Sequence, residues 1–145
     1  ESRKGRELGE NAFAEAVFHW DAQGRQVRLS GPVLRSPAAE SDEYFQSRPR
    51  ESRIGAWASC QSQPVASRAD LIGRFEAAAS RFGEGEVPRP PHWGGNRLWP
   101  ERMELWVSGD ARIHDRAVWT REVTSPGGND EPVVTGPWSA TRLQP

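Results

Sequence analysis

The run Arg112-Ile113-His114-Asp115-Arg116 carries the side chains with the clearest chemistry in this sequence. If the run is a strand, alternation places Arg112, His114 and Arg116 on one face. Three cationic or titratable side chains on one face repel one another unless an anion lies opposite them. Such a face suits a phosphate or a carboxylate, and His114 exchanges protons near neutral pH. Trp106, on the preceding strand, fits as a wall of the same pocket, although a solvated outer face also explains the pattern.

A second set of polar side chains has a spacing of four residues: Tyr44, Arg48 and Ser52. On one continuous helix the three would share a face. Pro49 interrupts such a helix, so their convergence requires a kink. A phenol, a guanidinium and a hydroxyl near a helix start, where backbone N–H groups favour anions, form a reasonable phosphate site.

Arg3 and Lys4 lie beside the start of an expected helix and form a third candidate anion site. Gln26, Gln61 and Ser62 are polar residues next to predicted elements, where surface and turn residues are common. The three histidines and the one cysteine are scattered, so we expect no metal site. The sequence contains no phosphate-binding loop and no dinucleotide fingerprint.

Composition narrows the class of protein. The chain has 145 residues, a net charge of -1 and a mean hydropathy of -0.77, which argues against a membrane protein and against general nucleic-acid binding. The single cysteine, Cys60, forms no internal disulfide, so the cytoplasm is the expected compartment. Leu, Ile, Val and Phe make up only 17% of the residues, while seven Trp residues favour packing. We therefore expect one folded domain that packs against a partner chain or a further segment.

The elements that position these side chains are expected to be strands near both ends and helices between them. The expected strands are 12–20, 25–34 with a break at Gly31-Pro32, 103–107, 112–123, and a last one containing Trp138 and Leu143. A turn at 21–24 joins the first two strands as a hairpin. Loops are expected at 84–95 and 125–132.

The helices are expected after an N-cap at Ser2, from Ser36-Pro37 to just before Pro49, over 52–59, and from Ser67 to Gly83. The last of these opens on a capping box and carries an apolar stripe that we expect to cover a sheet. This order of elements predicts an α+β fold with an antiparallel sheet or barrel.

Several of these motifs resemble the pyridoxine/pyridoxamine 5′-phosphate oxidase family. The stretch Met103-Glu104-Leu105-Trp106-Val107, followed by Arg112-Ile113-His114-Asp115-Arg116, is similar to the C-terminal signature of that family. Further matching segments occur in the family's order over nearly the whole chain: 25–27, 44–49, 54–57, 61–62, 93–95 and 142–145.

The resemblance implies a split β-barrel with flanking helices, which forms a homodimer with FMN at the subunit interface. The implied FMN contacts are Arg3, Lys4, Gln26, Gln61, Ser62, Trp106 and Arg116. The implied substrate-phosphate site is Tyr44, Arg48 and Ser52, and the implied catalytic residues over the substrate ring are Arg112 and His114. The implied reaction oxidises pyridoxine or pyridoxamine 5′-phosphate to pyridoxal 5′-phosphate and reduces oxygen to hydrogen peroxide. It involves neither nucleic acid nor a membrane.

Leu105, Val107 and Asn96 stand where the family usually has an aromatic residue, Gln and another aromatic residue, so the edge of the pocket is expected to differ. The chain also begins inside the family pattern. We therefore expect residues 1–145 to be the C-terminal portion of the split barrel, with the dimerisation region but without the first strands.

Two alternatives remain open. One is a non-catalytic split-barrel protein that binds a flavin or pyridoxal phosphate, since this fold also hosts binding proteins. The presence of both Arg112 and His114 favours an enzyme over such a non-catalytic binding protein. The other is a related flavin oxidase that acts on another ring, such as a phenazine precursor. The substrate-phosphate set around Tyr44 argues against it.

Overall fold

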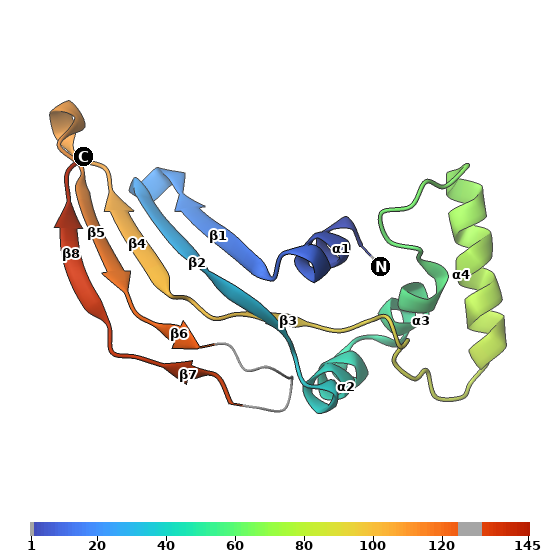
Figure 1. Cartoon of the computed structure of the whole chain (residues 1–145). Coiled ribbons are helices and arrows are strands. Elements are labelled where there is room, and N and C mark those ends of the chain that lie inside the picture. Colours follow the sequence, from blue (N-terminus) through green and yellow to red (C-terminus); the bar gives the residue numbers. More distant parts are fainter. Residues whose placement is uncertain (1, 125–131) are drawn as a thin grey trace. The chain divides into compact units, whose positions relative to one another are not determined.

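The structure is a computed structural model that describes residues 2–124 and 132–145. Its helices are α1 (Arg3–Glu10), α2 (Ala38–Ser47), α3 (Arg50–Ala58) and α4 (Arg68–Phe82) (Figure 1). Its strands are β1 (Phe13–Trp20), β2 (Arg25–Arg35), β3 (Asn96–Leu98), β4 (Arg102–Val107), β5 (Asp115–Thr120), β6 (Val123–Thr124), β7 (Val134–Thr135) and β8 (Ser139–Leu143).

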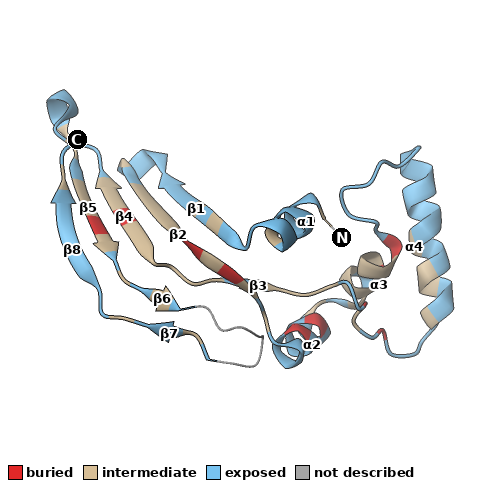
Figure 2. Cartoon of the chain, in the orientation of Figure 1, coloured by how far each residue is buried: buried red, intermediate tan, exposed pale blue. Residues whose placement is uncertain are grey.

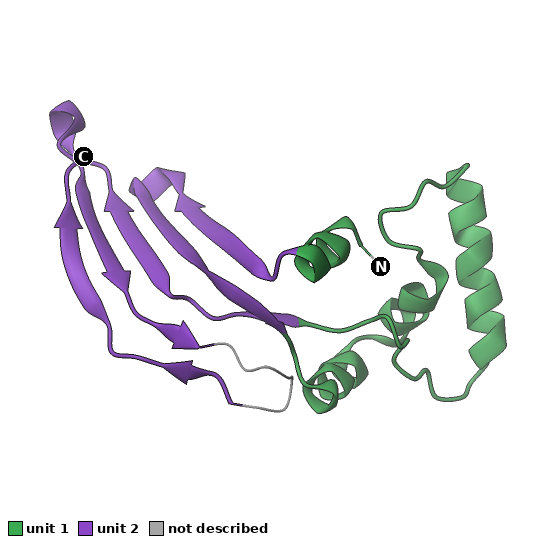
Figure 3. Ribbon diagram, viewed as in Figure 1, with its two compact units in different colours: residues 1–10, 35–95 green, residues 11–34, 96–145 purple. Residues whose placement is uncertain are grey.

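The chain divides into two compact units (Figure 3). The helix unit comprises residues 1–10 and 35–95, and it contains the four helices named above. The strand unit comprises residues 11–34 and 96–145 and contains the strands. The pairs β1–β2, β2–β4, β4–β5, β5–β8 and β6–β7 are all antiparallel, which confirms the expected α+β class.

The strand unit is built on a sheet with the order β1-β2-β4-β5-β8, and β3 also pairs with β2. β1 and β2 form the expected hairpin, in which Phe13 pairs with Pro32 and Trp20 with Arg25. Their turn ends at Gly24, which has a φ of 58° that glycine adopts without strain. β6 and β7 form a separate small sheet.

β2 differs from its prediction because it continues through Gly31 and Pro32 without a break. A Cβ on Gly31 would lie 2.1 Å from the carbonyl oxygen of Trp99, so only glycine allows the neighbouring main chain to approach this closely. The N–H of Trp99 then donates to the carbonyl of Pro32 at 2.9 Å. The Gly-Pro pair therefore marks a close approach inside the strand rather than its interruption.

The expected strand over 112–123 is also wrong in its bounds, because β5 covers only Asp115–Thr120. Asp110–Arg112 forms a 3-10 turn, in which Ala111 and Arg112 have positive φ angles of 51° and 65°. Strand alternation therefore does not place Arg112 and His114 on one face with Arg116. The apolar Ile113 suggested a strand, but the turn that follows β4 includes it.

The helix unit has a core of Phe45, Ile54 and Val87. Figure 2 colours buried residues red, including part of α2. Phe75 and Phe82 of α4 pack against this core, and α4 contacts α3. The cluster consists of helix and loop residues, so α3 replaces the expected sheet as the surface that α4 covers.

The predicted N-terminal signals of α1 and α4 are confirmed, whereas the expected starts of α2 and α3 are off by one and two residues. The Ser67 hydroxyl accepts a hydrogen bond from the Asp70 N–H at 3.0 Å, as a capping box requires, and α4 ends before Gly83. The Ser2 hydroxyl accepts from the N–H of Gly5 at 3.1 Å. α2 starts one residue after Pro37, and α3 starts at Arg50, two residues earlier than expected.

The remaining segments follow the predictions closely. Residues 84–95 form an irregular segment in which Val87 and Pro90 are fully buried. Trp138 immediately precedes β8, and Leu143 ends it. The loop expected at 125–132 lies outside the described residues except for its last position. No described helix has both the length and the apolar character needed to cross a bilayer.

Candidate functional site

Three of the expected cofactor contacts lie in one row across neighbouring strands. Gln26 of β2 pairs with Trp106 of β4, which in turn pairs with Arg116 of β5. Directly opposed residues in antiparallel strands project to the same face of the sheet. An amide, an indole and a guanidinium therefore stand side by side, although Gln26 and Trp106 are far apart in the sequence.

The buried carboxylate of Glu104 fixes the last member of this row. Arg116 donates to Glu104 Oε1 from Nη2 at 2.8 Å and from Nε at 3.2 Å, and Arg102 donates to Oε2 at 2.8 Å. Burial raises the pKa of Glu104, whereas the hydrogen bonds and positive charges of Arg116 and Arg102 lower it. The lowering is the larger effect, so the pKa of Glu104 lies below its ordinary value. Glu104 is therefore ionised at neutral pH.

Glu104 belongs to the motif Met103–Val107, but the sequence patterns predict no role for it. Strand alternation could have shown that Glu104 shares a face with the expected cofactor contact Trp106, because it lies two residues before Trp106 in β4. Arg116 of the neighbouring β5 projects from this same face of the sheet, so the Glu104 carboxylate lies on the face of an expected cofactor contact.

His114 lies against Trp106, with 4.8 Å between the ring centroids. Its Nδ1 accepts a hydrogen bond from the N–H of Gly109 at 3.1 Å. A neutral imidazole that accepts at Nδ1 carries its proton on Nε2. A Cβ on Gly109 would lie 2.0 Å from the carbonyl oxygen of Ile113, so glycine is required for this loop to close. The loop thus presents His114 as an Nε2–H donor beside the row.

Two expected site residues have left-handed backbone conformations that are uncommon outside glycine. Arg112 has a φ of 65° and Ser62 a φ of 66°. Such conformations cost free energy and concentrate at binding and catalytic sites. Arg112 and His114 come together in one loop of the strand unit, although the expected strand face does not hold them.

In the helix unit, the indole of Trp93 brings two members of the expected phosphate site together. The Tyr44 ring stacks on Trp93 with 6.0 Å between centroids, and the Arg48 guanidinium lies 5.3 Å from the Trp93 centroid. Phe45 meets the same ring edge-on at 5.1 Å. Trp93 is a second residue to which sequence reasoning assigned no role.

The kink required between Tyr44 and Ser52 is present. α2 ends at Ser47, Arg48 is extended with a ψ of 148°, and Pro49 is the N-cap of α3. Ser52 therefore lies in the first turn of α3, beside its N–H groups.

The other expected contacts of the helix unit lie on exposed surface. Arg3 and Lys4 are in the first turn of α1, where the Arg3 Nε lies 2.7 Å from Glu7 Oε1. Gln61 and Ser62 are in the turn after α3. The expected FMN contacts are thus divided between the two units, and within the strand unit the structure aligns Gln26, Trp106 and Arg116.

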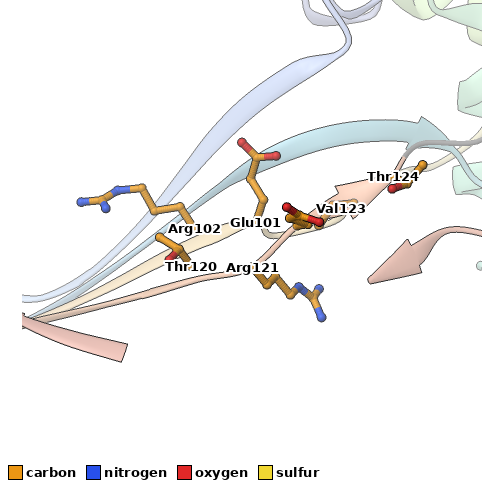
Figure 4. Close-up of a pocket in the computed structure, with 7 residues that line it drawn as sticks. Glu101, Arg102, Thr120, Arg121, Val123 and Thr124 are labelled. Atoms are coloured by element: carbon orange, nitrogen blue, oxygen red, sulfur yellow. The ribbon is translucent and has the colours of Figure 1, made fainter. Parts of the chain in front are cut away.

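An open pocket of about 530 Å³ lies at the ends of β4 and β5, lined by residues 101–102 and 120–124 (Figure 4). Arg121 donates to the carbonyl of Pro100 at 2.8 Å, and its guanidinium lies 4.4 Å from the Trp138 centroid. The lining contains none of the expected site residues, so this pocket is separate from the row. Within the described ranges, no three His, Cys, Asp or Glu side chains gather as metal ligands would.

The departures from the family signature lie away from the row. Leu105 pairs with Val27 and Ala117, on the face of the sheet opposite to Trp106. Val107 is at the end of β4 on that same opposite face, and Asn96 begins β3. The row itself therefore keeps the expected residue types.

Two family models match this chain. The one described as pyridoxamine 5′-phosphate oxidase matches residues 1–82. The one described as the pyridoxine 5′-phosphate oxidase C-terminal dimerisation region matches residues 93–145.

Curated relatives carry the same family name. A pyridoxine/pyridoxamine 5′-phosphate oxidase of Burkholderia multivorans (strain ATCC 17616 / 249) is 47% identical over 145 residues, which are 100% of this chain and 63% of the relative. The corresponding protein of Anaeromyxobacter dehalogenans (strain 2CP-C) is 52% identical over 121 residues, or 83% of this chain and 61% of that protein. The chain therefore spans a little over three fifths of the length of these relatives.

Two solved structures have a similar fold. PhzG from Burkholderia lata 383, in complex with tetrahydrophenazine-1-carboxylic acid, matches 99% of this chain and 64% of its own, with a TM-score of 0.80 and 30% identity. A pyridoxamine 5′-phosphate oxidase-related, FMN binding protein from Nostoc punctiforme PCC 73102 matches 99% of this chain and 68% of its own, with a TM-score of 0.63 and 15% identity. The second likeness concerns the fold alone, and it agrees with the expected split barrel. On the family models and these identities, the chain belongs to the pyridoxamine 5′-phosphate oxidase family.

Proposed function

We propose that this chain forms part of an FMN-dependent oxidase that converts pyridoxine or pyridoxamine 5′-phosphate to pyridoxal 5′-phosphate. The observation that carries the proposal is the row of Gln26, Trp106 and Arg116 with His114 against its central indole. The row offers hydrogen-bond donors for a flavin, and it has the His114 imidazole beside it for the handling of protons.

The chemistry of this row fits FMN. Trp106 offers a flat aromatic surface, Gln26 an amide that donates and accepts, and Arg116 a guanidinium with five N–H donors. Three of those N–H groups are engaged by Glu104 and the carbonyl of Gln144, and 28% of the Arg116 side chain remains exposed. The guanidinium is thus fixed in place and still reaches solvent, as a ligand contact must.

In the proposed mechanism, bound FMN would supply the two-electron acceptor, with oxygen as the final oxidant and hydrogen peroxide as the product. The protein binds and orients the substrate. Tyr44, Arg48 and Ser52 hold its phosphate, with the guanidinium kept in place by the Trp93 ring. His114 presents Nε2–H, and with Arg112 it holds the substrate ring and its exchangeable protons.

We further propose that the protein is a homodimer with FMN between its subunits, supported by the match of residues 93–145 to a dimerisation region. A cytoplasmic location is proposed because Cys60 is an exposed free thiol, which suits a reducing compartment. Nucleic acid and membranes are not among the proposed partners.

A second candidate is a flavin oxidase that acts on a phenazine precursor, which the likeness to PhzG favours. The set of Tyr44, Arg48 and Ser52 favours the phosphorylated substrate instead, since a phenol, a guanidinium and a hydroxyl at a helix start offer more donors than the two oxygens of a carboxylate use.

The test uses the full-length protein that contains this chain. The visible spectrum after addition of FMN reports flavin binding, and peroxide release under air is then followed with pyridoxine 5′-phosphate and with tetrahydrophenazine-1-carboxylic acid in parallel. Turnover of the phosphorylated vitamer is expected. Turnover of the phenazine precursor alone would assign the second candidate, and flavin binding without turnover of either would assign a non-catalytic binding protein.

A further inference from the structure

We propose that Glu104 is a positioning residue, which orients the Arg116 guanidinium for FMN binding. The inference rests on the proposed function, because it takes Arg116 to be a cofactor contact. Glu104 itself is only 5% exposed and lies in the neighbouring row on the same face of the sheet, between Arg28 and Val118. Its effect on FMN is therefore expected to pass through Arg116.

The geometry of the pair is specific. Oε1 of Glu104 receives two hydrogen bonds from Arg116, while Oε2 receives one from Arg102. Both carboxylate oxygens are thus engaged by different arginines from β4 and β5. A guanidinium bonded through Nε and Nη2 cannot rotate without breaking both bonds, so Glu104 sets the plane of the Arg116 head group.

Burial of this carboxylate needs a reason, because taking a charge out of water is costly even when it is paired. The residue opposite Glu104 on β5 is the buried Val118, so an apolar side chain would suit the local surroundings. Orientation of Arg116 is a gain that an apolar residue at position 104 would not provide.

The charges around Glu104 allow two possible effects on FMN affinity to be distinguished: the effect of its negative charge and the effect of orienting Arg116. Glu104 faces Arg102 and Arg116, and across the strand pair it faces Arg28, which is bonded to Glu15 on β1. Removing the Glu104 charge makes the face more positive, which by itself attracts an anionic cofactor. Loss of orientation acts in the opposite direction. The sign of the change in FMN affinity therefore distinguishes the two roles.

The experiment measures FMN dissociation constants by flavin fluorescence quenching in the full-length protein, together with the visible spectrum of the bound flavin. Glu104→Gln keeps the side-chain shape and is expected to weaken FMN binding about tenfold, the loss expected of a charge-assisted hydrogen bond. Glu15→Gln is the matched control, because it removes one negative charge from the same face. It is expected to change the affinity less than twofold.

A cycle with Arg116→Ala tests whether Glu104 acts through Arg116. In the Arg116→Ala background, Glu104→Gln is expected to change FMN affinity less than twofold, whereas a general structural role would weaken binding in both backgrounds. If Glu104→Gln does not fold, Glu104→Asp takes its place, since it keeps the charge and shortens the reach.

Three results would overturn the proposal: unchanged or tighter FMN binding by the folded Glu104 variant, an equal loss in both backgrounds, or unchanged binding by Arg116→Ala alone. An unaltered protein that binds no FMN would instead remove the proposed function on which this inference depends. The two failures are therefore distinguishable.

Discussion

The two units hold their candidate side chains in different ways. In the strand unit, Arg116 has a side chain that is 28% exposed, and a buried carboxylate fixes it. In the helix unit, the Arg3 side chain is 80% exposed and Tyr44 is 64% exposed. Arg116 of the strand unit is therefore held by hydrogen bonds before any ligand arrives, whereas the more exposed Arg3 and Tyr44 of the helix unit have more conformational freedom to lose when they bind.

From this contrast we predict two kinds of effect. Substitutions at the site in the strand unit should lower turnover or the free energy of unfolding, while substitutions at the phosphate site in the helix unit should mainly raise the KM for the substrate.

The largest effect is expected from His114→Ala, which removes the imidazole held by Gly109 and Trp106. Turnover should fall by about 10²- to 10⁴-fold, the usual contribution of general acid–base catalysis, with far less loss of bound FMN. Arg112→Ala is expected to behave similarly. Steady-state peroxide release per bound flavin is the measurement, and His92→Ala, an exposed histidine of the helix unit, is the control. Flavin loss with normal turnover per bound flavin would refute the role of His114.

The next effect concerns folding and compares one glycine from each unit. Gly31→Ala should destabilise the protein by about 2 kcal/mol or more, because a Cβ at this position of β2 would collide with the carbonyl oxygen of Trp99, which follows β3. Gly73→Ala, in α4 with open space around it, should stabilise by about 1 kcal/mol. Urea denaturation measures both. A Gly31 variant as stable as the parent would show that the close approach of the main chain is not a constraint on β2.

In the helix unit, Trp93→Leu should raise the KM for the phosphorylated substrate roughly tenfold with little change in kcat, since aromatic and cation–π contacts of this kind contribute about 1 kcal/mol each. The reason is that Tyr44 and Arg48 both rest on the Trp93 ring. Trp57→Leu is the matched control, because Trp57 also carries an arginine over its ring but contacts Arg81 and Pro88 instead. A fall in kcat at constant KM would contradict this division between the units.

The smallest effect is the pH dependence of stability that Glu104 confers. The folded-state pKa of Glu104 is lowered, so the unfolded chain takes up this proton more readily. The stabilisation is therefore complete above the ordinary value of 4.5 and is lost as the pH falls through the lower folded-state pKa. Glu104→Gln should flatten this part of the curve of unfolding free energy against pH, and the loss should be smaller than that caused by Gly31→Ala. If the variant loses stability below pH 4.5 as steeply as the parent, other carboxyl groups are responsible for the loss of stability in acid.

Residue patterns anticipated much of the fold, because many signals act over a few residues. The capping box at Ser67 fixes the start of α4 through one hydroxyl and one N–H, and both lie within a single turn. The β1–β2 hairpin follows from two alternating segments around a short turn at Gly24. The same locality explains the errors, since nothing near Gly31 shows that Trp99 packs against it, and Ile113 looks like a strand residue until the turn is seen.

The sequence alone determined which residue types are present, where most helices and strands lie, and the family to which the chain belongs. The tertiary structure decided which of those residues meet. Gln26, Trp106 and Arg116 share a row because β2, β4 and β5 pair in one register, and Arg116 is oriented because Glu104 is buried beside it. Pairing register and burial depend on the free energy of the whole sheet, summed over residues distant in sequence, so no window of the sequence contains them.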